Sequence, residues 1–65
     1  PVIGDRVYVG VNSAVIGPIT IGDEVTIGAG AVVVDNIPNN CVVAGVPARI
    51  IKTGAPAYPG LRNDL

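Results

Sequence analysis

Residues 3–10, Ile-Gly-Asp-Arg-Val-Tyr-Val-Gly, recur with small changes as residues 21–28, Ile-Gly-Asp-Glu-Val-Thr-Ile-Gly. Sliding the chain by eighteen positions gives seven identities in eighteen. An aliphatic residue also returns every six positions through six consecutive hexads, at Ile3, Val9, Val15, Ile21, Ile27 and Val33. Repetition at a fixed period is typical of solenoids. The pattern therefore predicts an eighteen-residue coil built from three short strands.

A second slot lies two residues before the aliphatic one. Residues two apart on a strand share a face, so we expect both slots to point inward and the residue between them to point outward. The second slot holds Val7, Ser13, Ile19, Val25, Ala31 and Ile37, and the outward residues are Tyr8, Ala14, Thr20, Thr26 and Val32. Turn-forming residue types lie between the strands, at 4–5, 17–18, 22–23, 28–30 and 35–36.

Three strand-and-turn units per coil predict a triangular prism whose coils stack ~4.8 Å apart through parallel main-chain hydrogen bonds. Each inward Val or Ile contributes roughly 1.5–3 kcal/mol by burial, whereas ordering costs roughly 1–2 kcal/mol per backbone residue. Two coils and a partial third are marginal on that comparison, and solenoid ends need caps. We therefore expect the C-terminal piece of a longer protein, or a core that relies on neighbouring subunits.

Composition excludes several classes of partner. Hydrophobic residues make up 49% of the chain, but no apolar run approaches a membrane span. Four basic residues against five acidic ones offer no electrostatic footprint for nucleic acid. The single Cys41 cannot form an internal disulfide and fits a reducing compartment.

The hexad register is expected to fail after Pro38, because Asn39-Asn40 replace the next Ile-Gly and Gly45 falls in an aliphatic slot. Residues 44–52 then read Ala-Gly-Val-Pro-Ala-Arg-Ile-Ile-Lys. One interpretation is a turn followed by an edge strand that Pro47 blunts. The other is a ligand site, in which the Ala44-Gly45 backbone allows close approach while Arg49 and Lys52 bind an anion. Spacing does not decide between the two.

The hexads from Ile3 to Val33, followed by Ile37-Pro38 and by Ala-Gly-Val-Pro-Ala-Arg at 44–49, resemble the C-terminal part of the hexapeptide-repeat acyltransferases. The resemblance covers residues 1 to about 52. It implies a left-handed parallel β-helix over 1–52 with an irregular tail over 53–65, acetyl-CoA as co-substrate, a homotrimer or higher homo-oligomer, and a cytoplasmic location. Handedness comes from the resemblance alone, because parallel crossovers are right-handed in nearly all other folds.

Two branches of this family compete. The pattern Gly17-x-Ile19-x-Ile21-Gly22 and residues 44–50 resemble the serine O-acetyltransferases, which make O-acetylserine and CoA from acetyl-CoA and L-serine. Sugar acetyltransferases often carry Thr-Lys where Val34-Asp35 stands here, so the serine branch is favoured. The alternatives are a sugar or polysaccharide O-acetyltransferase and a non-catalytic structural β-helix.

The resemblance also limits the chemistry of this chain. The family uses a His general base on the acceptor hydroxyl, and the sequence contains no His. Asp5, Asp23 and Asp35 repeat at turn positions and are interpreted as turn formers, so we expect no catalytic residue here. A zinc-dependent γ-type carbonic anhydrase would need three His ligands, and we expect no metal.

Cofactor-binding residues can be carried over by position. In the family the pantetheine arm bonds main-chain groups after the hexad glycine, which are Val11 and Ala29 in this sequence. A small residue that merely suits a corner is the competing interpretation, and the bulk of Val11 departs from the usual Ala or Gly. Ala44, Gly45, Arg49 and Lys52 complete the predicted site, with Arg49 near the nucleotide phosphates. Stacked Ala14 and Val32 are the candidate contact between subunits.

Overall fold

The computed structural model describes residues 1–54 of the 65-residue chain as strands and turns. Within that range there are eight strands and no helix. They are β1 Val2–Ile3, β2 Tyr8–Val9, β3 Ala14–Val15, β4 Thr20–Ile21, β5 Thr26–Ile27, β6 Val32–Val33, β7 Cys41–Ala44 and β8 Arg49–Thr53. The predicted division into a solenoid over 1–52 and a tail over 53–65 stays a prediction, because most of that tail lies outside the described residues.

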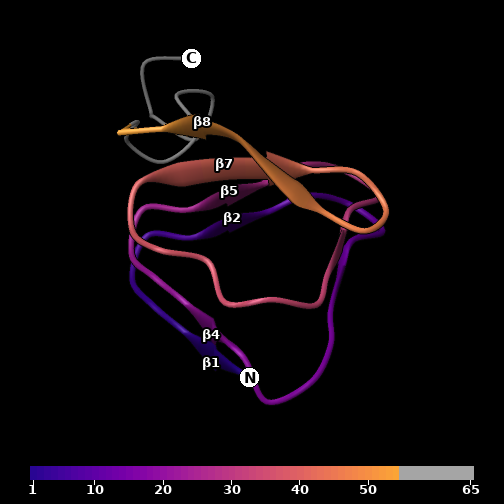
Figure 1. Cartoon of the computed structure of the whole chain (residues 1–65), viewed down its shortest axis with the longest axis horizontal. Coiled ribbons are helices and arrows are strands. Elements are labelled where there is room, and N and C mark those ends of the chain that lie inside the picture. Colours follow the sequence, from indigo (N-terminus) through magenta and orange to yellow (C-terminus); the bar gives the residue numbers. More distant parts are fainter. Residues whose placement is uncertain (55–65) are drawn as a thin grey trace.

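The strands form three sheets that make the faces of a prism. β1 pairs with β4, β3 pairs with β6, and the third sheet has the order β2-β5-β7-β8. Every pair is parallel except β7 with β8. In Figure 1, β2, β5 and β7 lie above one another, and β8 crosses the far end of that sheet. The fold is the predicted left-handed parallel β-helix, closed at its C-terminal end by an antiparallel hairpin.

The first two coils keep the predicted eighteen-residue step, with Val2 opposite Thr20 and Tyr8 opposite Thr26. The third coil does not. Ile21 pairs with Ile37, and Thr26 pairs with Val42, so the step shortens to sixteen residues.

The predicted place of Ile37 in the second slot, beside Ile19, is therefore wrong: Ile37 occupies the aliphatic slot. The register also does not fail after Pro38 as expected. Two residues are missing from the corner before Ile37, and the hexad pattern then resumes, with Val43 in the aliphatic slot and Gly45 at a corner. The Asn36 side chain bridges the shortened corner to the coil before it, because its Oδ1 accepts a hydrogen bond from the Thr20 N–H at 2.8 Å.

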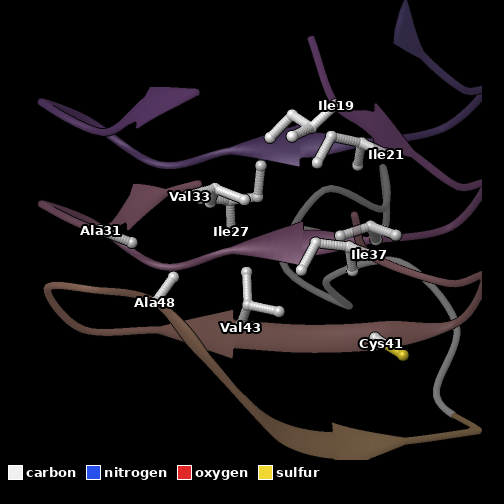
Figure 2. Close-up of a cluster of buried hydrophobic side chains, with 10 residues drawn as sticks. Ile19, Ile21, Ile27, Ala31, Val33, Ile37, Cys41, Val43 and Ala48 are labelled. Atoms are coloured by element: carbon white, nitrogen blue, oxygen red, sulfur yellow. The ribbon is translucent and has the colours of Figure 1, made fainter. Parts of the chain in front are cut away.

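The core fills the prism from the second coil onward. Its buried members are Ile19, Ile21, Val25, Ile27, Ala31, Val33, Ile37, Cys41, Val43 and Ala48, most of which Figure 2 labels between the stacked strands. The inward slots of the first coil are less covered: Ile3 is 43% exposed and Val9 is 50% exposed. Within residues 1–54 nothing packs on the outer side of that coil.

Thr26 differs from the expected outward residues because it is buried rather than exposed. Its neighbours in the ladder are Tyr8 on one side and Val42 on the other. These larger side chains flank it on the outer face, since directly paired residues lie side by side. The Thr26 Oγ1 has no hydrogen-bond partner within the described part of the chain.

The glycines that follow the aliphatic slot do not have left-handed backbone. Of the turn-forming stretches expected at 4–5, 22–23 and 28–30, the last contains a left-handed glycine, Gly30, and the left-handed residues of the other two corners are Arg6 and Glu24. At Gly10, whose φ is also not positive, an added Cβ would lie 2.6 Å from the Ala29 nitrogen and 2.7 Å from the Ile27 oxygen. Glycine is therefore needed in that slot because the next coil's backbone crosses directly above it.

The C-terminal end of the prism is closed by the loop between β7 and β8. Val32 donates a hydrogen bond to the Gly45 carbonyl at 3.0 Å and accepts one from the Ala48 N–H at 2.8 Å. The buried Ala48 side chain reaches the core beside Val43 (Figure 2). The interpretation as a turn followed by an edge strand is confirmed. Pro47 does not blunt that strand, because it lies in the loop.

Candidate functional site

The predicted cofactor positions share one corner of the prism. Val11 and Ala29 each follow the glycine that comes after a strand of the same sheet, and these strands stack in register. Gly30 donates a hydrogen bond to the Val11 carbonyl at 2.9 Å, which ties the two coils together at this corner. Because the third coil steps by sixteen residues, Gly45 occupies the matching place after β7. We call Val11, Ala29 and Gly45 the corner column.

Several main-chain groups of the corner column are available to a ligand. Within residues 1–54 no hydrogen bond uses the N–H or C=O of Ala29, or the N–H of Val11. Ala29 and Val11 are both exposed. A backbone amide is an obligatory hydrogen-bonding group, so these donors and this acceptor suit a ligand that itself carries amide groups. The Val11 carbonyl is not available, because Gly30 occupies it.

Two cations lie at the C-terminal end of the same sheet. Arg49 pairs with Ala44 and Lys52 pairs with Val42, while Val43 pairs with Ile50. In a regular strand, residues three apart point to opposite faces. A register shift between Val42 and Val43 inserts one extra residue in β8. Arg49 and Lys52 consequently share the outer face, because Val42 and Ala44 alternate with the inward Cys41 and Val43.

Arg49 ends a row of small residues that runs beside the corner column. Gly10 donates to the Ile27 carbonyl and Gly28 donates to the Val43 carbonyl, both at 2.8 Å, so the row continues from coil to coil. Ala44 follows, and β8 then places Arg49 opposite Ala44. A bidentate guanidinium and a flexible ammonium are the two side chains that proteins use for phosphates. The structure thus brings Ala29, Gly45 and Arg49 to one edge of the prism.

The Asp23 carboxylate lies at a different corner and binds the backbone of the neighbouring coil. The Asp23 Oδ1 accepts a hydrogen bond from the Asp5 N–H at 2.7 Å, and the Asn39 Oδ1 does the same for the Asp23 N–H at 2.7 Å. The interpretation of Asp23 as a turn former is supported by this bond. Asn39 is the member of the series that the eighteen-residue spacing missed, and the sixteen-residue step explains it.

An ion pair lies beside that series. Arg6 Nε donates to Glu24 Oε2 across the two coils. The hydrogen bond and the charge of Glu24 raise the pKa of the Arg6 guanidinium above its ordinary value. The pair is a surface contact of the kind that contributes little to stability. Arg6 is thereby committed to Glu24, whereas the Arg49 and Lys52 side chains form no ion pair or hydrogen bond among residues 1–54.

Residues 1–54 contain no group of three or more His, Cys, Asp or Glu side chains that could hold a metal ion. In the same range there is no helix long and apolar enough to cross a membrane. Cys41 is a free thiol, buried in the core.

Comparison with known proteins assigns the repeat. The family model "Bacterial transferase hexapeptide (six repeats)" matches residues 1–35. The chain belongs to the hexapeptide transferase family. A serine acetyltransferase of Mycobacterium tuberculosis is 48% identical over 60 residues, which are 92% of this chain and 26% of that protein. A putative lipopolysaccharide biosynthesis O-acetyl transferase of Escherichia coli, WbbJ, is 53% identical over 51 residues, covering 78% of this chain and 26% of the relative.

Solved structures agree with the fold. A galactoside acetyltransferase in complex with coenzyme A superposes with a TM-score of 0.78 at 44% identity, over 80% of this chain and 26% of that one. This chain thus spans about a quarter of the length of the hexapeptide transferases it matches.

Proposed function

We propose that the intact protein is an acetyl-CoA-dependent O-acetyltransferase, and that residues 1–65 contribute its coenzyme A site. The observation that carries the proposal is the alignment of unused main-chain groups at Val11 and Ala29 with the two cations Arg49 and Lys52. Amides at one end and cations at the other match the amide-bearing arm and the phosphates of coenzyme A. Membership of the hexapeptide transferase family and the coenzyme A-bound galactoside acetyltransferase support this reading.

In this proposal each residue of the corner binds one part of the co-substrate. The Ala29 N–H and C=O and the Val11 N–H bond the amides of the pantetheine arm. Ala44 and Gly45 leave the backbone accessible beside it. Arg49 and Lys52 hold the phosphates, because β8 presents both on the outer face. These residues bind and orient the thioester.

Acetyl-CoA supplies an activated acetyl group, which passes to a hydroxyl as the CoA thiol leaves. We assign no general base for the hydroxyl proton to the described residues. The sequence has no His, and Asp23 is occupied at a turn. Direct transfer therefore requires a base from elsewhere in the intact protein.

We assign serine as the acceptor. The support is the serine acetyltransferase of Mycobacterium tuberculosis, which aligns with 92% of this chain. A sugar hydroxyl is the second candidate, because WbbJ reaches 53% identity. The acceptor would be held outside the described residues, so these identities favour a branch and do not define an acceptor pocket.

The test measures release of CoA thiol from acetyl-CoA by the intact protein, with L-serine in one reaction and galactoside or maltose in parallel ones. The proposal expects turnover with L-serine at least tenfold faster than with either sugar. Faster turnover with a sugar would transfer the assignment to the sugar branch. No thiol release with any acceptor, from protein that remains folded, would contradict the acetyltransferase proposal.

Association of subunits is part of the same proposal, and a homotrimer is the state we assign. Ala14 pairs with Val32 on the outer face of the β3-β6 sheet. Ile16 and Val34 follow those strands at the next corner and are 55% and 43% exposed. These four residues form an aliphatic strip that suits a protein contact. Cytoplasmic localisation stays a prediction.

A further inference from the structure

The corner column narrows in side-chain size from one end to the other. Val11 is its largest member and is 69% exposed. Ala29 and Gly45 follow at successive coils, toward Arg49. Two features restrict the conformations open to Val11. Its carbonyl accepts the Gly30 hydrogen bond at 2.9 Å, and a β-branched side chain has few χ1 rotamers. Val11 is therefore a stiff apolar projection at the end of the column farthest from the cations.

The spacing of the coils determines which part of coenzyme A lies beside Val11. From Arg49 through Ala44 and Gly28 to Gly10 there are three strand-to-strand steps, or roughly 14 Å at ~4.8 Å each. About twelve bonds separate the pyrophosphate from the sulfur, and an extended chain advances ~1.2 Å per bond, which gives roughly 14 Å. With phosphates at Arg49, the sulfur lies level with Gly10 and Val11.

We propose that Val11 sets the size of the acyl group, admitting acetyl and excluding longer chains. This inference rests on the proposed function, because it takes coenzyme A to lie along the corner column. An acyl group extends beyond the sulfur, at the level of the exposed Val11 side chain. Val11 offers no polar atom beyond its main chain, so its side chain acts by shape.

A single methylene in an apolar site changes discrimination by about 10–200-fold. The test measures equilibrium binding of S-ethyl-coenzyme A and S-butyl-coenzyme A to the intact protein by calorimetry. These thioethers do not transfer an acyl group, so binding is read without turnover. The parent should bind the S-ethyl ligand at least tenfold more tightly than the S-butyl ligand. In Val11→Ala the ratio of the two affinities should fall to about threefold or less.

Val2→Ala is the matched control, because Val2 is an exposed branched residue in a different sheet, the β1-β4 sheet. It should keep the affinity ratio of the parent. The inference is overturned if the parent shows no preference for the S-ethyl ligand, or if Val11→Ala retains the parent's ratio. A titration with free coenzyme A distinguishes failure of the Val11 role from failure of the proposed function. If the parent does not bind free coenzyme A, the proposed function fails as well. If coenzyme A binds but Val11→Ala keeps the parent's ratio of S-ethyl to S-butyl affinity, only the proposed role of Val11 is refuted.

Discussion

Replacing Gly10 with Ala should destabilise the protein far more than the same change at Gly28. Both glycines follow an aliphatic slot of the same sheet, and neither has a positive φ. An added Cβ at Gly10 would lie 2.6 Å from the Ala29 nitrogen, whereas at Gly28 the nearest atom is the Ala44 Cβ at 3.3 Å. Ordinary contact begins at 3.4 Å. Relief at Gly10 thus needs a separation of 0.8 Å from rigid backbone, while Gly28 needs about a tenth of an ångström.

The cost follows from that separation. The hydrogen bond from the Gly10 N–H to the Ile27 carbonyl is 2.8 Å long, and a stretch of this size takes it beyond normal hydrogen-bond length. Its loss costs ~1 kcal/mol, and overpacking costs typically ~1–3 kcal/mol. Both variants share the gain from a less flexible unfolded chain, ~0.4–1 kcal/mol. The difference between them should therefore be about 2–4 kcal/mol.

Urea unfolding of the two variants in the intact protein, followed by circular dichroism, measures the difference. With a slope of ~1–3 kcal/mol per M, the midpoint of Gly10→Ala should lie roughly 1 M or more below that of Gly28→Ala. Equal midpoints with equal slopes would refute the reasoning. They would mean that the coils separate freely at Gly10, and that close stacking does not explain the glycine slot.

Three other outcomes are expected. The 65-residue chain alone should release no CoA thiol from acetyl-CoA and serine above the buffer rate, because it contains no His; turnover by the purified fragment would show that the base lies within it. Val32→Asp should lower the sedimentation mass of the intact protein toward one chain, since it puts a charge on the aliphatic strip, and an unchanged trimer mass would remove that face from consideration. Ile27→Ala, at a fully buried position, should cost ~2–5 kcal/mol in urea unfolding, whereas Val2→Ala, at an exposed position, should stay within ~0.5 kcal/mol; similar losses for both would contradict the assigned core.

Periodicity predicted the coil, the inward slots and the parallel pairing because each depends on a spacing that the sequence repeats. It misplaced Ile37 because the third coil is two residues shorter, and the shortening is stabilised by a side chain, Asn36, that no spacing rule signals. A sliding step of sixteen would have aligned Val43 with Ile27 and revealed the continuation. The glycine slots were recognised, but their cause was not, since contact between coils is a tertiary effect.

The candidate site was predicted in part. Val11, Ala29 and Arg49 came from resemblance to a family, and the structure places them along one edge of the prism. The third member of the column, Gly45, could not be placed there by an eighteen-residue repeat. The common face of Arg49 and Lys52 was also beyond sequence reasoning, because an odd spacing predicts opposite faces and only the β-bulge reverses that.

The central claim is that Arg49 holds the phosphates of coenzyme A at the end of the corner column. Calorimetry of coenzyme A and dephospho-coenzyme A with the intact protein and its Arg49→Gln variant tests this most directly, with Arg6→Gln as the control cation at another corner. A charge-assisted contact contributes about 1.5–3 kcal/mol, so Arg49→Gln should weaken binding of coenzyme A by roughly one to two decades. Arg6→Gln should bind as the parent does, and a smaller loss with dephospho-coenzyme A would identify the 3′-phosphate as the partner of Arg49. Binding of both ligands by Arg49→Gln as tightly as by the parent would make Arg49 an ordinary strand-end residue and contradict the account.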